Sequence, residues 1–284
     1  MKFGVVFPQT QIGADPVTLR DFAQAAEGMG YHHILAYDHV LGANPDRPGW
    51  DTGRPYTYAD MFHEPFTLFS WMAGFTETIG FMTGVLILPQ RQTALVAKQA
   101  TQVDLLSGGR FRMGIGVGWN AVEYNSLGYD FSTRGARCEE QIAILRELWT
   151  RELVDIDGRF ETIDDAGINP TPKQPISIWI GGSADVVLGR AACLSDGYVA
   201  QSGAPEQAKP FCDKYWAYAY DCGRTDSVGL HTRLSTESVP ESEWESYVAG
   251  WESLGATELA VYPHGEVLDD YLARLQRFKD MFGV

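Results

Sequence analysis

The feature that most constrains the fold is an alternation of short apolar segments with longer stretches of helical patterning. The patterning is clear in residues 135–150, where Ile142, Leu145, Leu148 and Trp149 recur at helical spacing. The apolar segments have the length and composition of buried strands and span residues 3–7, 33–37, 79–88, 110–116, 176–180, 198–200, 228–234 and 258–261. Eight units, each a strand followed by a helix, predict an α/β protein whose parallel sheet closes on itself, the (β/α)8 TIM barrel.

Two segments interrupt the alternation, and we interpret them as insertions after strands two and four. A polar loop rich in Pro and Gly occupies residues 38–60, and a β-like excursion around Asp157-Gly158 occupies residues 153–175. Loops of this length in a compact domain are usually functional or disordered. No linker divides the chain, so we expect a single domain over residues 1–284. An open doubly wound sheet is disfavoured, because no G-x-G-x-x-G motif follows the first strand.

The charge of the chain argues against two classes of partner. Its 22 basic and 37 acidic residues give a net charge of −15, and no basic run occurs anywhere. We therefore expect neither nucleic acid nor an anionic membrane surface as a partner. The longest apolar stretch, residues 79–89, is much shorter than the roughly 20 residues that a membrane span needs.

The cysteine and histidine patterns give no sign of a disulfide framework or a metal site. Cys138, Cys193, Cys212 and Cys222 show no C-x-x-C spacing, so we expect four reduced, mostly buried thiols and a cytoplasmic location. The histidines show neither H-x-H nor H-E-x-x-H spacing, which disfavours metal binding and a metal-dependent hydrolase.

In a barrel of this kind the chemistry lies at the carboxyl ends of the strands. The second predicted strand ends in Asp38-His39, a carboxylate next to an imidazole. Histidine can exchange a proton near neutral pH, and a neighbouring acid can orient it. The pair is therefore a candidate for acid–base chemistry. The alternative interpretation is a polar loop start in which His39 only packs against its neighbours.

Glycines mark two further strand ends. Gly181-Gly182-Ser183 lies between strand five and the next helix, where free amide groups can bind a phosphate. A plain turn capped by Ser183 or Asp185 is the alternative. Alternate glycines also run through strand four from Gly114 to Gly118. They leave room in the barrel for a flat ligand, or they only fit the taper of the core.

An ordered series of motifs, covering most of the chain, resembles one known family. The series is MKFGVVFP (1–8), DH (38–39), TGVLILP (83–89), AKQA (97–100), LSGGRF (106–111), GIGVGWN (114–120), LWT (148–150), IWIGGS (178–183) and DGY (196–198). In these residues the chain resembles the bacterial luciferase-like superfamily, in particular its branch of coenzyme F420-dependent oxidoreductases, found largely in actinobacteria. The resemblance implies a luciferase-like (β/α)8 barrel with an insertion after strand four.

The resemblance also implies a cofactor site. Gly84 and Val85 match a non-proline cis peptide that backs the central ring of the flavin-like cofactor in the family. The loop Gly181-Gly182-Ser183 matches the segment that holds the cofactor phosphate. The further cofactor contacts that the resemblance implies are Gly116, Val117, Gly118, Trp119, Asn120 and Gln201.

Asp38 and His39 match the pair beside the ring in F420-dependent alcohol and sugar-phosphate dehydrogenases. By this resemblance His39 would act as general acid or base during hydride transfer, and Asp38 would orient it or hydrogen-bond the deazaflavin. Trp119 departs from the pattern, because the sugar-phosphate enzymes carry Glu there, so we expect no phosphorylated sugar as substrate. The loop at residues 41–60 is expected to cover the substrate with Trp50, Tyr56 and Tyr58.

Two alternatives remain open at this stage. FMN binds the same barrel through a phosphate loop and a cis peptide, so an FMN-dependent monooxygenase served by a separate flavin reductase is one of them. A non-catalytic barrel that stores or senses a flavin or deazaflavin is the other. We expect a small-molecule substrate and, as often in this family, a homodimer. The sequence leaves open the roles of His63, Arg91, Arg134, Arg137 and His264, which either contact cofactor or substrate or form helix-end ion pairs and solvated charges.

Overall fold

Adjacent parallel strands form where the sequence is continuously apolar. The computed structural model describes residues 1–51, 53–201 and 203–284. In it, β1 (Lys2–Val6) pairs with β2 (His33–Ala36), with Val5 opposite Ile34 and every side chain of β2 buried. Strands that are covered on both faces have such continuous apolar runs, because neither face meets water.

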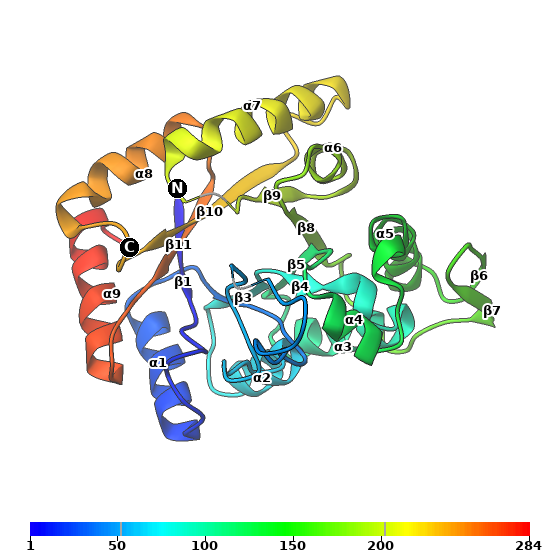
Figure 1. Ribbon diagram of the computed structural model, residues 1–284, viewed down its shortest axis with the longest axis horizontal. Helices are drawn as coiled ribbons and strands as arrows, with labels where there is room; N and C mark the ends of the chain where they lie inside the picture. Colours follow the sequence, from blue (N-terminus) through cyan, green and yellow to red (C-terminus); the bar gives the residue numbers. More distant parts are fainter. Residues whose placement is uncertain (52, 202) are drawn as a thin grey trace.

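The strands close into a barrel (Figure 1). The other barrel strands are β3 (Gly80–Thr83), β4 (Leu86–Ile87), β5 (Phe111–Gly116), β8 (Ser177–Gly181), β9 (Gly197–Val199), β10 (Gly229–Ser235) and β11 (Glu258–Tyr262). Their order is β3-β2-β1-β11-β10-β9-β8-β5-β4, and β3 also pairs with β5, which closes the ring. Every pairing in the barrel is parallel, so the predicted (β/α)8 barrel is confirmed.

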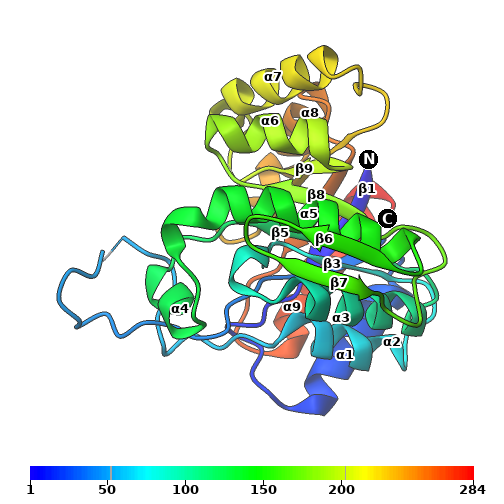
Figure 2. The same cartoon turned by 90° about the vertical axis from the view of Figure 1, so that its right-hand side faces the viewer.

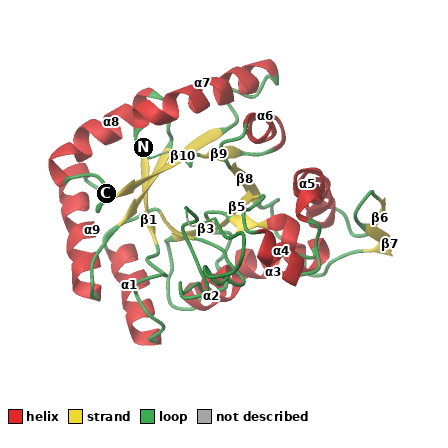
Figure 3. Ribbon diagram, in the orientation of Figure 1, coloured by secondary structure: helices red, strands yellow, loops and turns green. Residues whose placement is uncertain are grey.

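Helices surround the barrel (Figure 3). They are α1 (Pro16–Gly28), α2 (Pro65–Ala73), α3 (Thr93–Leu106), α4 (Ala121–Ser126), α5 (Arg134–Thr150), α6 (Asp185–Leu194), α7 (Pro205–Asp221), α8 (Trp244–Ser253) and α9 (Leu268–Phe282), with short 3-10 turns η1 (Leu88–Gln90), η2 (Phe131–Thr133) and η3 (Glu241–Glu243). The predicted start of α1 is confirmed: the Asp15 carboxylate accepts the Thr18 amide at 3.0 Å, ahead of Pro16. Among the described residues, none of these helices has the length and apolarity that crossing a bilayer requires.

Apolar side chains form two separate layers. The barrel interior contains a small cluster of Val6, Leu35, Met82, Trp179, Val199 and Ala260. A much larger cluster fills the space between the strands and the helices, and its largest side chains include Trp244, Trp251, Tyr215 and Phe278. The barrel interior is therefore a packed core.

The third predicted strand is not continuous, which corrects its expected span of residues 79–88. It breaks into β3 and β4 at the peptide bond between Gly84 and Val85, and that bond is cis, as the resemblance implied. After the break, Leu86 and Ile87 resume pairing with β5 opposite Ile115 and Gly116. Val85 stands at the break, on the carboxyl side of the barrel.

The two predicted insertions are present. The polar loop before α2 extends from the barrel on the same side as α4 (Figure 2). The excursion at residues 153–175 contains an antiparallel hairpin of β6 (Val154–Asp157) and β7 (Thr162–Ala166). The second hairpin strand begins two residues later than the sequence pattern indicated. The amides of residues 159–161 donate to the Glu140 carboxylate of α5 and so form a turn there.

The expectation of four free thiols is wrong. Cys193, near the end of α6, forms a disulfide with Cys222, which caps α7. The two residues are 29 positions apart, and their Cα atoms are brought to 5.7 Å by the packing of α6 against α7, which local spacing does not reveal. Cys138 and Cys212 are free and buried, as predicted. The argument from reduced thiols to a cytoplasmic location therefore loses its basis.

Closure of the barrel leaves no room for a side chain at Gly114. A Cβ there would lie 2.1 Å from the Thr83 carbonyl oxygen, and the Thr83 hydroxyl donates to the Gly114 carbonyl at 2.6 Å. We expect Gly114→Ala to lower the free energy of unfolding by about 1–3 kcal/mol or more, measured by urea denaturation. Gly28→Ala is the matched control, because open space surrounds Gly28 in α1, and it is expected to be neutral or stabilising by up to about 1 kcal/mol. Equal midpoints for the two variants would contradict this account.

Candidate active site at the carboxyl ends of the strands

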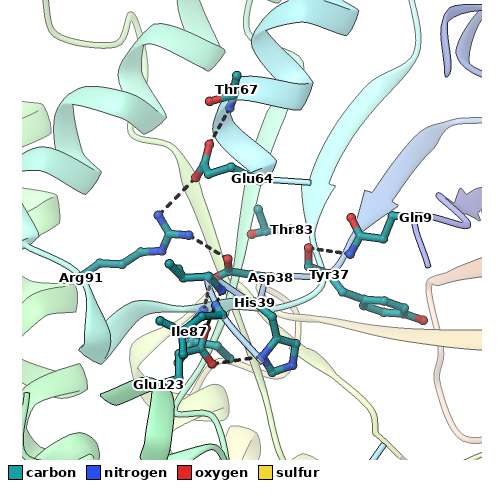
Figure 4. A network of polar contacts seen from close by, with 12 residues as sticks. Gln9, Tyr37, Asp38, His39, Glu64, Thr67, Thr83, Ile87, Arg91 and Glu123 are labelled. Atoms are coloured by element: carbon teal, nitrogen blue, oxygen red, sulfur yellow. Dashed lines mark hydrogen bonds and ion pairs between the residues drawn. The ribbon is translucent and has the colours of Figure 1, made fainter. Parts of the chain in front are cut away.

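Asp38 is part of a buried ionic brace (Figure 4). Its carboxylate accepts a hydrogen bond from Arg91 Nη2 at 2.7 Å and from the Ile87 amide at 2.9 Å. Arg91 also reaches the Glu64 carboxylate at 3.2 Å, and Glu64 in turn caps α2 through the Thr67 amide. Burial acts to lower the pKa of Arg91, but the charges of Asp38 and Glu64 outweigh it and raise that pKa. The brace therefore fixes the end of β2 against β4 and α2.

His39 is held by a different carboxylate, that of Glu123 on α4. The two side chains meet at 3.1 Å between Nδ1 and Oε2. The other carboxylate oxygen of Glu123 accepts the amides of Val40 and Leu41. Because a carboxylate only accepts, Nδ1 carries a hydrogen and Nε2 is left with its lone pair when the imidazole is neutral. Among the described residues, Nε2 has no hydrogen-bond partner.

Glu123 is buried, with 1% of its side chain exposed, and it is charged. Burial raises the pKa of Glu123. The hydrogen bonds from His39 and from the Val40 amide lower it by more than burial raises it, so the net pKa is below the ordinary value of 4.5. A buried carboxylate that is ionised and fixed by two backbone amides can hold an imidazole in one tautomer and one orientation.

The resemblance implied that Asp38 would orient His39 or hydrogen-bond the deazaflavin, and in the structure the carboxylate that contacts the imidazole is that of Glu123. The Asp38 carboxylate is turned toward Arg91 and away from the imidazole (Figure 4). Glu123 was missed because it is 84 residues from His39 and is brought there only by barrel closure. A local signal existed, since Asn120 caps α4 through the Val122 amide and so fixes Glu123 in its first turn.

Aromatic side chains surround the His39 ring. The rings of Phe62, Tyr56 and Trp119 have their centroids 4.8, 5.4 and 5.5 Å from it. Trp50 packs on Trp119 at 5.9 Å, and the Arg54 guanidinium lies over the same indole at 5.3 Å. Through Tyr56 and Trp50, the loop at residues 41–60 therefore packs on His39 and Trp119. Its role as a cover for substrate stays a prediction; Tyr58 is exposed to solvent, and Thr52 lies outside the described residues.

The glycines at the end of β5 and just after it serve packing within the barrel. At Gly116 a Cβ would lie 2.6 Å from Val85 Cγ2, and at Gly118 it would lie 2.7 Å from Ile87 Cγ2. Gly181, at the end of β8, is equally close to Val85 Cγ1, at 2.8 Å. The space that these glycines leave is thus filled by side chains of the interrupted third strand. Gly116 and Gly181 thus back Val85, which forms an apolar platform at the mouth of the barrel.

The loop Gly181-Gly182-Ser183 leads into α6, as predicted, and the alternative of a turn capped by Ser183 or Asp185 does not occur. Ala184 occupies the N-cap position and offers no side-chain acceptor. The Asp185 carboxylate is turned to Lys214 at 2.8 Å and to the Tyr218 hydroxyl at 2.9 Å. Ser183 is exposed at the start of a ten-residue helix whose first amides lack a side-chain cap. This arrangement suits an anion at the helix start.

Three further predicted positions have structural partners in this region. Asn120 is buried and caps α4, and the Val117 carbonyl accepts the Tyr124 hydroxyl at 2.7 Å. Gln201, after β9, lies with its amide nitrogen 2.8 Å from where a Gly181 Cβ would stand. Its amide oxygen accepts from Arg233 Nη2 at 3.2 Å. Of the three, Gln201 has the most exposed side chain.

Four residues whose roles the sequence left open have contacts in the structure. The Arg137 guanidinium pairs with Glu161 and lies over Tyr129, and Arg134 lies over Phe131. His63 contacts the Gly13 carbonyl at 3.3 Å, and His264 contacts Ser235 and Glu237, both at 3.2 Å. Each of these contacts joins neighbouring loops or helix ends.

A second polar cluster lies at the opposite, amino-terminal ends of the strands. His32, His33 and Glu258 each offer one ligand atom, all within 4.8 Å of one another, a grouping that the spacing of the histidines did not predict. Arg112 donates to Glu258 Oε1 at 2.6 Å, however. Burial and then the charge of Arg112 lower the pKa of both histidines. This resident positive charge disfavours a divalent cation there.

A closed parallel barrel with a buried carboxylate–histidine pair at its strand ends, under an aromatic cover, has the architecture of a barrel enzyme. Over residues 1–280 the chain matches the family described as luciferase-like monooxygenase, and it belongs to that family. This places the protein among the luciferase-like oxidoreductases and monooxygenases.

Two curated relatives illustrate the similarity. An uncharacterised protein of Mycobacterium tuberculosis is 33% identical over 215 residues, which cover 74% of each chain. The pyrimidine monooxygenase RutA of Cronobacter sakazakii is 30% identical over 246 residues, which cover 80% of this chain and 67% of RutA.

Solved structures share the fold at low sequence identity. The monooxygenase RslO1 from Streptomyces bottropensis superposes with a TM-score of 0.79 at 17% identity, covering 99% of this chain and 98% of RslO1. An F420-dependent secondary alcohol dehydrogenase in complex with an F420–acetone adduct gives 0.70 at 14%, covering 98% and 90%. Riboflavin lyase RcaE, with modified FMN and riboflavin, gives 0.79 at 13%, covering 100% and 92%.

The lowered pKa of Glu123 predicts a pH dependence of stability. Because the folded protein holds this carboxylate ionised, the unfolded chain binds its proton more tightly. The stabilisation is therefore complete above pH 4.5 and is lost as the pH falls through the lower pKa of the folded state. We expect the unfolding free energy of the wild type to decrease more steeply below pH 4.5 than that of Glu123→Gln, measured by urea denaturation. The exposed Glu245→Gln should keep the wild-type slope; parallel curves for the wild type and Glu123→Gln would contradict the assignment.

Proposed function

We propose that the protein is an oxidoreductase that transfers a hydride between coenzyme F420 and a small organic substrate, with His39 as general acid or base. The observation that carries this proposal is the His39–Glu123 pair. Glu123 holds Nδ1 at 3.1 Å and leaves Nε2 as the atom that can take or give a proton at a substrate oxygen. A barrel that only stored cofactor would have no need for an oriented proton-transfer group.

The residues at the mouth of the barrel fit a flavin-like cofactor. Val85, backed by Gly116 and Gly181, is a firm apolar surface on which a planar ring can rest. The uncapped start of α6, with the exposed Ser183 hydroxyl, would hold the cofactor phosphate, and Gln201 would contact the ring from β9. When bound there, deazaflavin supplies a carbon that accepts or donates a hydride.

The aromatic cover would exclude water from this chemistry. Trp119, Tyr56 and Phe62 leave only 10% of the His39 side chain exposed. Removing water strengthens the electrostatic coupling between an imidazole and its carboxylate and prevents the loss of protons to solvent. Asp38 would act indirectly in this proposal, since its brace with Arg91 and the Ile87 amide keeps the strand ends next to His39 in place.

FMN is the second candidate cofactor, and a specific observation favours it. RutA, at 30% identity, is by name a monooxygenase, whereas the F420-dependent alcohol dehydrogenase shares the fold at 14% identity. In that case the protein would be a monooxygenase that uses reduced flavin and oxygen, with a flavin reductase as partner. The two candidates share the Val85 platform and the phosphate loop. They differ in their need for an oriented proton-transfer group, which favours F420.

Titration of the purified protein with each cofactor separates the candidates. We expect F420 to bind more tightly than FMN, measured by quenching of protein fluorescence. Ser183→Asp should weaken F420 binding by roughly tenfold or more, because it adds a negative charge where the phosphate is expected. The exposed Ser253→Asp on α8 is the matched control and should leave binding unchanged. Tight binding of FMN without binding of F420 would refute the choice of cofactor.

Replacement of His39 tests its catalytic role. Once a substrate is found by screening alcohols and carbonyl compounds for a change in deazaflavin absorbance, His39→Gln should lower kcat by about 10²- to 10⁴-fold. F420 affinity should stay close to that of the wild type, because the ring does not depend on the imidazole in this proposal. Glu123→Gln should lower kcat to a smaller extent and shift the pH profile. Full turnover by His39→Gln would overturn the assignment.

A further inference from the structure

A second compartment opens beside the proposed cofactor platform. It is a cavity of about 500 Å³ at the carboxyl ends of β9, β10 and β11, next to α7 and α8. Its inner wall is formed by Tyr37, Gln201, Arg233, Ser235, Tyr247 and Tyr262. Neither Val85 nor the glycines that back it contribute to this wall, so the cavity is distinct from the platform. Gln201 is the residue that the two share.

Arg233 is the cation of this cavity. Its Nη2 donates to Gln201 Oε1 at 3.2 Å, and its guanidinium carbon lies 5.4 Å from the centre of the Tyr37 ring. Within the described ranges, no carboxylate comes within 4.0 Å of it. Other partly buried arginines near strand ends are satisfied differently: Arg91 is paired with Asp38 and Arg112 with Glu258. Arg110, before β5, donates to the backbone carbonyls of Ser107, Ile79 and Thr76.

A guanidinium without a counter-ion at the floor of a cavity indicates an anionic ligand. Partial burial removes water from the charge, and an aromatic ring with one amide oxygen compensates only part of that loss. A carboxylate would complete the compensation of this charge, since its two oxygens match the two parallel N–H groups of the guanidinium. Ser235 and the tyrosine rings of the wall suit the rest of a small, partly apolar organic molecule.

The outer rim restricts the charge of that ligand. Glu206 and Glu243 line the cavity near its opening, and both are exposed to solvent. Their charges add to the negative field of a chain with a net charge of −15. A second negative group on the ligand would lie toward these carboxylates and would be repelled. The cavity therefore suits a monoanion better than a dianion.

Tyr56 connects this cavity to the proposed catalytic histidine. Its ring packs on His39, with centroids 5.4 Å apart. Burial raises the pKa of Tyr56, the neighbouring Tyr37 and Tyr262 raise it further, and the charge of Arg233 acts against them. Tyr56 is therefore a neighbour of His39 and lies close enough to Tyr37, Tyr262 and Arg233 of the wall to be affected by their charges.

We propose that the cavity binds the carboxylate of a monocarboxylic acid substrate and that Arg233 is the residue that recognises it. This inference rests on the proposed function for the reaction itself, but binding of the carboxylate needs no cofactor. Arg233 is a specificity-determining residue in this view, because it selects the substrate by charge and takes no part in proton transfer.

Binding of a simple aromatic acid tests the proposal. Benzoate is the probe, benzamide is its neutral counterpart of nearly the same shape, and terephthalate is the dianion. Calorimetric titration of the cofactor-free wild type should give benzoate an affinity at least tenfold above that of benzamide and of terephthalate. Arg233→Met should reduce benzoate affinity by roughly 10- to 100-fold and leave benzamide unchanged, since charged hydrogen bonds are lost.

Matched variants separate this effect from a general change in charge or folding. Arg151→Met removes one positive charge from the exposed end of α5, outside the site, and should leave benzoate binding unaltered. Glu243→Gln should improve terephthalate binding relative to benzoate. Arg233→Lys should retain an intermediate affinity, and it replaces Arg233→Met if circular dichroism shows that the latter is unfolded.

Three results would overturn the proposal: no binding of benzoate, equal binding of benzoate and benzamide by the wild type, or unchanged benzoate affinity in a folded Arg233 variant. Failure of the proposed function has a different signature, because F420 would then fail to bind while the preference for benzoate persisted. Binding of F420 with no preference for benzoate would refute the carboxylate site alone.

Discussion

Pairing of β3 with β5 is the constraint on which the rest of this structure depends, because it closes the parallel sheet and gathers every carboxyl strand end at one mouth. Closure requires close approach of the backbones. Gly114 allows it by leaving room for the Thr83 carbonyl, and Gly116 does so for the Val85 side chain. A side chain at either glycine would collide with the third strand on one or other side of its break at Gly84 and Val85. The shape of the mouth is thus a consequence of how the ring closes.

Around this mouth each buried carboxylate has its own hydrogen-bonding or ionic partners. Asp38 is neutralised by Arg91, and Glu123 is stabilised by two backbone amides and an imidazole. A buried carboxylate left without such partners would cost several kcal/mol. Arg233 is the exception, since its counterpart within the described residues is an amide oxygen and an aromatic face. Because Arg233 lacks the carboxylate partner that Arg91 has, we place the proposed ligand at Arg233 and a supporting role at Arg91.

The proposed oxidoreductase reaction and the proposed carboxylate site divide the work between opposite sides of the mouth. The side formed by β4, β5 and β8 supplies Val85 and the start of α6, which suit a planar cofactor with a phosphate. The side formed by β2, β10 and β11 supplies Tyr37, Arg233 and Tyr262, which suit a small acid. His39 and its cover from the 41–60 loop lie with Tyr56 next to the second side. Such a division lets one barrel keep its cofactor and vary its substrate by changing a few side chains.

The sequence alone determined the barrel, its two insertions and the aromatic loop after the second strand, and its motifs marked Gly84 and Val85 through their resemblance to a known family. Each of these depends on periodicity, on a glycine or on a motif, all of which are local in the chain. The tertiary structure decided the partners. Glu123 instead of Asp38 orients His39, Cys193 joins Cys222, and Val85 fills the space that the glycines leave. These contacts join residues tens of positions apart, and a linear pattern does not carry the distance between two strands or helices that only the closed ring brings together.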